Sequence, residues 1–397
     1  MINGRDVVIL SAVRTAVGKY GGGLKDVPPA ELGAAVVRES IKRSGVAPED
    51  IGHTVFGNVI HTEQRDMYLS RVVAVKGGVP VSAPALTVNR LCGSGLQAII
   101  SAAQVLQMGD AEAAVAGGAE CMSRAQYWMP SLRWGQRMND AAVVDVMVAA
   151  LTDPFDNVHM GITAENIAKK WGISREDQDA LAVESHRRAV AAIKNCLFKG
   201  QIVPIELKSK GGPVLFDTDE QPRADATLAG LAKLRPAFDP NGTVTPGNAS
   251  GINDGAAAVV LMDERAAADR GLKPIARLVD YTIAGVDPKY MGIGPVPAVK
   301  SLLAKTGLTV QDIDVFEVNE AFAAQALAVA RDLELPSDKT NPNGSGIGLG
   351  HPLGATGAVL TVKAIHELHR MGGRYGLVTM CIGGGQGIAA LFEAIHN

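Results

Sequence analysis

The sequence has 397 residues, of which 47% are hydrophobic, enough to form two or three packed domains of a soluble globular protein. Lysine and arginine total 38 against 41 for aspartate and glutamate, and the net charge of -3 argues against nucleic acid or a membrane surface as a partner. Four cysteines in so long a chain do not indicate a disulfide framework, and they favour a reducing, cytoplasmic setting. No signal-peptide pattern precedes the strand predicted at residues 7–10, and no uninterrupted apolar stretch reaches membrane-spanning length.

An internal repeat organises the chain. A single offset of 262 residues aligns Gly45 with Gly307 and Gly95 with Gly357. Each copy contains a helix, a strand, a glycine-rich turn, an apolar helix and a second strand. These elements are predicted at residues 30–44, 54–56, 91–95, 97–107 and 113–116 in the first copy, and at 299–306, 315–318, 344–354, 358–368 and 377–380 in the second. The alternation predicts an α/β sheet core in each half.

A segment of about 130 residues interrupts the repeat. Because it breaks the pattern, we interpret it as an insertion. It runs from residue 121 to 250 and contains all three tryptophans. Residues 164–171 and 175–195 are predicted to form a helix pair, the second helix opened by Ser174 as its N-cap. Beyond residue 199 the segment is rich in proline and glycine and resembles a loop, and the first half resumes with a strand at 256–262. We interpret it as an inserted functional domain.

Cys92 lies in a turn with Gly93 and Gly95, directly before the first apolar helix. The glycines leave room for a substrate carbonyl to approach the sulfur and for backbone amides to point at an anion. The helix would direct its positive end at Cys92 and favour the reactive thiolate. We therefore predict a nucleophile, with a buried, inert cysteine as the alternative.

Two further glycine-rich turns carry reactive side chains. His351 lies in the turn of the second copy, and Cys381 ends the following strand, with four glycines among the next six residues. Taken singly, these residues are equally compatible with a hydrogen-bonded loop histidine and a core cysteine. Because Cys92 and His351 occupy equivalent turns, two pseudo-symmetric halves could bring all three residues into one cleft.

A dinucleotide site is the rival explanation for these glycines. The run at 344–350 follows Asn-Pro-Asn instead of an apolar strand, and the run at 383–387 leaves no room for a second strand with a ribose-binding acid. His366 and His369 lack zincin spacing, so we expect no metal.

Four motifs, in order, resemble the signatures of the thiolase family: the Cys92 turn, Asn-Glu-Ala-Phe from Asn319, Gly-His-Pro-Leu-Gly around His351, and Cys-Ile-Gly-Gly-Gly-Gln-Gly from Cys381. The resemblance spans essentially the whole chain and is strongest to the biosynthetic acetyl-CoA acetyltransferases and short-chain β-ketothiolases. It implies two duplicated βαβαβαββ halves packed as a five-layered α-β-α-β-α core with an inserted loop domain. The halves would be residues 1–120 with 251–273, and 274–397, and the insertion would be 121–250.

The resemblance implies a reversible Claisen condensation of acetyl-CoA with acetyl-CoA or a short acyl-CoA, and the reverse thiolysis. Cys92 would carry the acyl group, His351 would take its proton, and Cys381 would exchange the proton of the carbon acid. His351 and a water held by Asn319 would stabilise the enolate, and the amides of Cys92 and Gly383 would form a second oxyanion hole.

Coenzyme A and acyl-CoA would be substrates, with no tightly bound cofactor. The resemblance places His159 and Ser250 near the pantetheine and thioester, Met160, Met291 and Phe322 around the acyl pocket, and Arg223, Ala237 and Phe238 near the nucleotide. Arg223 suits a phosphate contact by its charge, the alternative being a solvated loop arginine. The sequence departs from the family at Pro246, where many members have alanine, and at Cys121, where serine is commoner. Residues 128–138 would form the tetramerisation loop of a homotetramer, a dimer of dimers.

Three alternative functions stay open at this point. A degradative 3-ketoacyl-CoA thiolase of β-oxidation would share every motif and accept a broader range of chain lengths. A decarboxylating ketoacyl synthase would want a second histidine where Cys381 stands. A non-catalytic acyl-CoA carrier would not need Cys92, His351 and Cys381 together.

Overall fold

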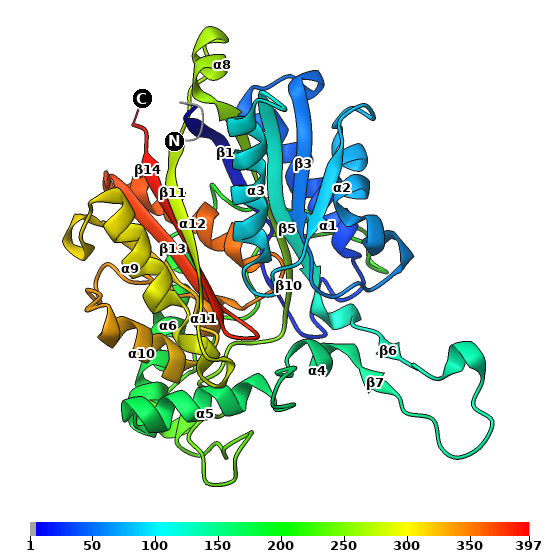
Figure 1. Ribbon diagram of the computed structural model, residues 1–397, viewed down its shortest axis with the longest axis vertical. Helices are drawn as coiled ribbons and strands as arrows, with labels where there is room; N and C mark the ends of the chain where they lie inside the picture. The colour runs from blue at the N-terminus through cyan, green and yellow to red at the C-terminus, as the bar shows by residue number, and fades with distance from the viewer. Residues whose placement is uncertain (1–4, 397) are drawn as a thin grey trace.

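Two copies of one strand order form the central sheet of the computed structural model, which describes residues 5–396 (Figure 1). The N-terminal half contributes the order β4-β3-β5-β10-β1, and the C-terminal half contributes β12-β13-β14-β11. These strands are β1 (Val7–Arg14), β3 (Ile51–Gly57), β4 (Ala85–Val88), β5 (Ala113–Cys121), β10 (Asn253–Asp263), β11 (Ala276–Gly285), β12 (Val315–Val318), β13 (Tyr375–Ile382) and β14 (Gln386–Ala394). The halves join where β1 pairs with β11, and the short β2 (Gly18–Lys19) pairs with β10.

Matching strands of the two halves pair in the same directions. β3 is parallel to β5 as β12 is to β13, and the next strand, β10 or β14, is antiparallel in each half. The predicted duplication is therefore confirmed. Most elements are longer than predicted: β5, for example, continues through Gly117, Gly118 and Glu120, which interrupt the apolar run on which the prediction depended.

Five layers of helix and sheet enclose three hydrophobic cores. The middle core extends over both sides of the central helix layer. Helices α1 (Pro29–Ser44) and α2 (Leu69–Gly77) pack on the outer face of the N-terminal sheet. Helices α3 (Ser94–Met108) and α12 (Thr356–Met371) lie between the two half-sheets, and α9 (Pro295–Thr306) and α10 (Ala323–Asp332) cover the C-terminal sheet. The predicted α-β-α-β-α order is confirmed.

The two central helices approach each other closely at their first turns. A Cβ atom on Gly95 of α3 would stand 2.7 Å from the backbone nitrogen of Ala358, and a Cβ on Gly357 of α12 would overlap the nitrogen of Leu96. Gly95 and Gly357 are the pair that the internal repeat aligned. This contact therefore brings the turn before α3 next to the turn before α12.

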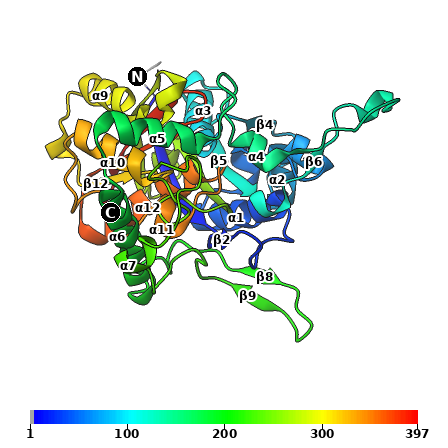
Figure 2. The same cartoon turned by 90° about the horizontal axis from the view of Figure 1, so that it is seen from below.

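The inserted segment forms two arms and a helical layer. Hairpin β6–β7 and hairpin β8–β9 both extend away from the body of the molecule (Figure 2). The elements are β6 (Tyr127–Trp128), β7 (Val144–Asp145), α4 (Val146–Ala150), α5 (Met160–Trp171), α6 (Arg175–Lys194), β8 (Ile205–Leu207), β9 (Val214–Phe216) and α7 (Leu228–Leu231). The predicted helix pair is present, and the Ser174 hydroxyl accepts the Asp177 amide at 3.0 Å as an N-cap.

The remaining short helices are α8 (Glu264–Asp269) and α11 (Gly346–Leu349). β10 returns the chain from the insertion to the N-terminal sheet, between β1 and β5. The division into three domains stays a prediction, and its outermost residues, 1–4 and 397, lie outside the described part of the chain. Among residues 5–396, no helix has both the length and the apolar character needed to cross a membrane.

Candidate active site

The turn before α3 presents Cys92 at the edge of the central layer. The Ser94 hydroxyl donates to the Leu91 carbonyl at 2.6 Å and accepts the Arg90 amide at 2.9 Å, which closes the turn. Leu91 is held in the left-handed region, at φ 44°, a conformation that costs a non-glycine residue about 1–2 kcal/mol. Cys92 is half-buried and packs with apolar residues that include Leu353 of the other half.

The surroundings of Cys92 favour the thiol over the thiolate that the helix end led us to expect. Burial raises its pKa to about 11, and the negative charge of Glu120 acts in the same direction. The amides of Gly383 and of Cys92 itself hydrogen-bond the sulfur and oppose this shift without cancelling it. Burial of the sulfur therefore opposes the effect expected from the helix terminus.

His351 is buried in the turn before α12, and its hydrogen bonds define its tautomer. Nδ1 lies 2.6 Å from Thr356 Oγ1, which itself donates to the Pro352 carbonyl at 2.9 Å. Nδ1 therefore carries the proton and donates, which makes Nε2 the acceptor of the ring. Asn319 Nδ2 lies 3.3 Å from that Nε2. Burial lowers the pKa of His351 to about 4, so the imidazole is neutral at pH 7 and can accept a proton at Nε2.

Asn319 is fully buried beside His351. Its amide nitrogen faces Nε2 of His351, whereas its oxygen has no hydrogen-bond partner among residues 5–396. A buried amide oxygen ordinarily finds a partner, so this atom is a candidate contact for a water or a substrate group.

Cys381 is buried at the end of β13 in an apolar cluster with Met160, Met291 and Phe322. These three are the residues predicted for the acyl pocket, and the structure brings them together around the second sulfur. Burial raises the pKa of Cys381, and the charge of Cys92 raises it further.

A cavity of about 650 Å³ extends from His351 to the protein surface. Its wall contains six of the eight residues predicted to bind coenzyme A, namely His159, Arg223, Ala237, Phe238, Ser250 and Phe322. The other two, Met160 and Met291, belong to the Cys381 cluster. The rings of His159 and Phe238 stack with centroids 4.5 Å apart, which gives the wall a flat apolar face.

The cavity wall also contains residues that sequence reasoning missed. Lys19, Tyr20, Glu220 and Gln221 line its outer part, from β2 and the end of the inserted segment. The glycines that flank Lys19 and Tyr20 were the available signal. Pro246, one of the two departures from the family, also lines the wall, whereas Cys121 is buried away from it.

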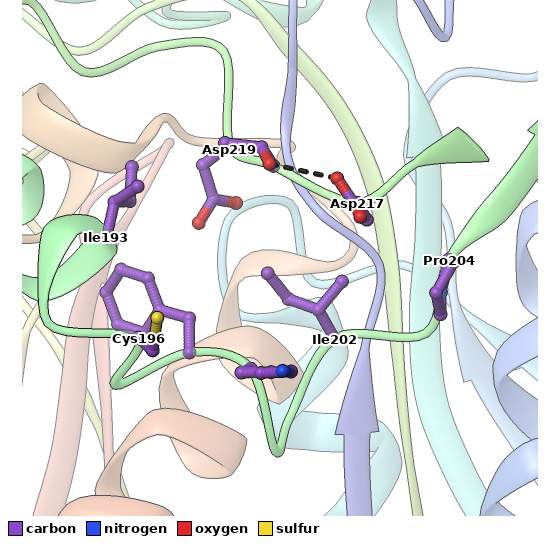
Figure 3. Close-up of a pocket in the computed structure, with 9 residues that line it drawn as sticks. Ile193, Cys196, Ile202, Pro204, Asp217 and Asp219 are labelled. Atoms are coloured by element: carbon purple, nitrogen blue, oxygen red, sulfur yellow. Dashed lines mark hydrogen bonds between the residues drawn. The ribbon is translucent and has the colours of Figure 1, made fainter. Parts of the chain in front are cut away.

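A second cavity, of about 400 Å³, lies between the end of α6 and hairpin β8–β9 (Figure 3). Cys196 and Asp219 line it, and no predicted site residue does. Asp219 is committed to Arg14, which donates to both carboxylate oxygens at 2.7 and 3.0 Å. The carboxylate in this cavity therefore belongs to a buried ion pair and is not available as a catalytic group. Across residues 5–396, no three His, Cys, Asp or Glu side chains are grouped to hold a metal ion.

Comparison with known families and structures agrees with this arrangement. The model of the thiolase N-terminal domain matches residues 7–265, and that of the thiolase C-terminal domain matches residues 272–394. The chain therefore belongs to the thiolase family.

Individual relatives resemble the chain over nearly its whole length. It is 65% identical to a protein named beta-ketothiolase BktB from Cupriavidus necator, over 98% of this chain and 100% of that protein. It is 50% identical to an acetyl-CoA acetyltransferase from Chromobacterium violaceum, over 98% and 99% of the two chains. The solved acetyl-CoA acetyltransferase of Bacillus anthracis superposes with a TM-score of 0.97 at 46% identity, with both chains fully covered. Human mitochondrial 3-ketoacyl-CoA thiolase in complex with CoA gives 0.96 at 43% identity, over 98% of both chains.

Proposed function

We propose that the chain is an acetyl-CoA C-acyltransferase that interconverts two acyl-CoA molecules with a 3-ketoacyl-CoA and coenzyme A through an acyl-Cys92 intermediate. The observation that carries the proposal is that His351 lines one cavity with Leu353, which packs with Cys92, and with Phe322, which packs with Cys381. The Nδ1 atom of His351 is hydrogen-bonded to Thr356, so its Nε2 is the atom that can accept a proton. One thiol can be deprotonated by the imidazole as it attacks, and the other remains an acid.

In thiolysis, Cys92 gives its proton to Nε2 of His351 as its sulfur attacks the keto carbon. The carbon–carbon bond then breaks, and its electron pair goes into the enolate of acetyl-CoA. Cys381 donates its S–H proton to the enolate carbon, a role that suits a thiol whose pKa is raised by burial. The thiol of free coenzyme A then attacks acyl-Cys92 and restores the proton of Cys381, while His351 returns its proton to Cys92. Condensation follows the same steps in reverse.

Two sets of donors would stabilise the oxyanions. The amides of Gly383 and Cys92, which already bond the Cys92 sulfur, are suited to the tetrahedral intermediate on that residue. His351 and Asn319 are adjacent at 3.3 Å, and they are suited to the enolate oxygen, with the water on Asn319 that the family resemblance implies.

The 650 Å³ cavity is the proposed route for coenzyme A, which enters as a substrate. Arg223 at its outer part would contact a phosphate, and Lys19 adds a second positive charge there. The stacked His159 and Phe238 would line the pantetheine path, and the Cys381 cluster would limit the acyl group to short chains.

Mass spectrometry after incubation with acetyl-CoA tests the intermediate. We expect one acetyl group, on the peptide that contains Cys92. Label on Cys381 alone would reverse the roles of the two sulfurs, and no label on either would reject the proposed chemistry.

The alternative is a degradative thiolase that accepts substrates of many chain lengths. The similarity to human mitochondrial 3-ketoacyl-CoA thiolase supports it. Thiolysis rates on 3-ketoacyl-CoA substrates of increasing length separate the two. Activity that falls beyond four or five carbons supports the short-chain enzyme.

Hairpin β6–β7 supports the proposed homotetramer. Trp134 and Met138 at its tip are 89% and 80% exposed, and an apolar arm of this kind is typical of an assembly contact. Light scattering at micromolar protein concentration should find a tetramer, and a monomer would refute the assignment.

A further inference from the structure

Glu120 is a buried carboxylate near the end of β5 that the proposed mechanism does not use. Its exposed fraction is 0%, and it accepts four hydrogen bonds. The donors are Asn58 Nδ2 at 3.1 Å, the Val59 amide at 3.0 Å, the Ile60 amide at 3.1 Å and the Gly354 amide at 2.8 Å.

All four partners are N–H groups, and Glu120 forms no ion pair within residues 5–396. A protonated carboxyl would have to point its O–H at one of these donors, so the arrangement fits the carboxylate. Burial raises the pKa of Glu120 to about 7, and the amide donors oppose this rise. An anion held only by amides is costly to bury, which calls for a reason for its presence.

The four bonds connect the two halves of the molecule. Three donors come from the segment that follows β3, in which Val59 and Ile60 pack in the same apolar cluster as Cys92. The fourth donor is Gly354, three residues after His351 in the C-terminal half. A single carboxylate thus binds one segment that packs near Cys92 and another that follows His351.

The carbonyl oxygen of Gly354 packs closely against two glycines of the N-terminal sheet. A Cβ atom on Gly57 would stand 2.7 Å from this oxygen, and a Cβ on Gly118 would overlap it. Both glycines belong to the N-terminal sheet, in β3 and β5. The peptide after His351 is therefore seated on the N-terminal half by backbone packing on one side and by Glu120 on the other.

We propose that Glu120 is a positioning residue that sets the register between the Cys92 turn and the His351 turn. It acts through the Gly354 amide and the Val59–Ile60 amides and touches neither substrate nor a reacting atom. The inference rests on the proposed roles of Cys92 and His351.

Two substitutions separate the geometry of Glu120 from its charge. Glu120→Asp keeps the charge but is one methylene shorter, so it cannot reach Gly354 and the Val59–Ile60 segment together. Glu120→Gln keeps the length but turns an amide NH₂ toward N–H donors. Both should lower kcat by about 10- to 100-fold and change KM less than about threefold, because a small misplacement of reacting groups acts on the chemical step.

The pH dependence of Cys92 alkylation, followed by peptide mass spectrometry, measures the effect of the Glu120 charge separately from its geometry, whereas the loss of kcat at nearly constant KM reports the positioning. The charge of Glu120 raises the pKa of Cys92, so the alkylation midpoint should fall in Glu120→Gln and stay in place in Glu120→Asp. The matched control is Asp66→Asn. Asp66 is an equally buried carboxylate without an ion pair among the described residues, but it binds only Thr62 and Glu63 of its own segment. Its charge also raises the pKa of Glu120 through space, so this variant is a control for kcat and not for the alkylation midpoint. This control should keep the wild-type kcat.

Wild-type kcat in a folded Glu120→Asp variant would overturn the proposal. If Glu120→Gln does not fold, Glu120→Asp alone decides the matter through kcat. A parallel loss of kcat in Asp66→Asn would assign the effect to general destabilisation and also count against the proposal. Failure of the proposed function is distinguishable, because it would show as wild-type Cys92 that takes no acetyl group.

Discussion

Helices α3 and α12 begin at equivalent positions of the two halves, yet the turns before them carry different chemistry. The N-terminal turn holds a half-buried thiol at Cys92, whereas the C-terminal turn holds a buried, neutral imidazole at His351. The C-terminal half adds Cys381 near the end of β13, whereas in the N-terminal half the last residue of β5 is Cys121, two positions beyond the residue that the repeat aligns with Cys381. A duplicated backbone therefore supplies equivalent turns, and the two turns differ in the side chain that each presents and in how deeply that side chain is buried.

The largest test of this contrast compares the two strand-end cysteines. Cys381→Ser should still be acetylated at Cys92 yet lose roughly 10²- to 10⁴-fold in condensation and thiolysis, because a hydroxyl is a poor proton carrier in place of a thiol. Cys121→Ser is the matched control and should keep its activity, since Cys121 is buried away from the cavity. The measurements are acetyl incorporation and turnover, and unimpaired turnover of Cys381→Ser would remove its role.

The second test removes one amide donor that the C-terminal half supplies to the Cys92 sulfur. Gly383→Pro should lower kcat by about 10²-fold, roughly 3 kcal/mol, with little change in coenzyme A affinity. Gly383→Ala retains the N–H, and its Cβ would meet only the ends of the Leu91 and Met160 side chains at 3.1 Å. Steady-state kinetics should therefore separate the two variants, and equal losses would attribute the effect to bulk.

The third test concerns the contact that brings the two turns together. Gly357→Ala would place a methyl group against the backbone of α3 and should lower the free energy of unfolding by about 1–3 kcal/mol. Gly211→Ala, where no atom lies within 4 Å, should be neutral. Urea denaturation measures both. A Gly357→Ala protein as stable as Gly211→Ala would mean that the helix crossing tolerates a side chain.

The last test concerns a pH dependence of stability that comes from His351 and is small for each unit of pH. The unfolded histidine binds a proton as the pH falls below its ordinary value of 6.5, whereas the folded one stays neutral until about pH 4. The unfolded state therefore binds more protons in that window, and acidification from pH 6.5 to 4 lowers stability by at most about 1.4 kcal/mol per pH unit.

His186, whose pKa burial also lowers to about 4, acts in the same direction, so the comparison must be between the wild type and His351→Gln. Urea denaturation at several pH values should show the shallower dependence in His351→Gln. Identical slopes would show that His351 is not held neutral.

Glycine and apolar patterns predicted the repeat, an α/β core in each half and the grouping of Cys92, His351 and Cys381. The five-layered fold and the residues of the coenzyme A cavity were predicted from the family resemblance. Burial could not be predicted in the same way. The raised pKa of Cys92 depends on residues from several elements that pack over it, among them Leu353 and Glu120. Thr356 was missed because its value lies in a hydrogen bond to His351 that only the folded turn creates. Glu120 was missed because three of its four donors are backbone amides, which carry no sequence signal.

The glycine contact between α3 and α12 also bears on how a duplicated chain folds. Each helix is covered on one side by its own sheet and on the other by the opposite half, within one continuous apolar core. A half expressed by itself would expose that second face to water, a large apolar patch that favours aggregation. We therefore expect the two repeats to unfold together, as a single cooperative unit.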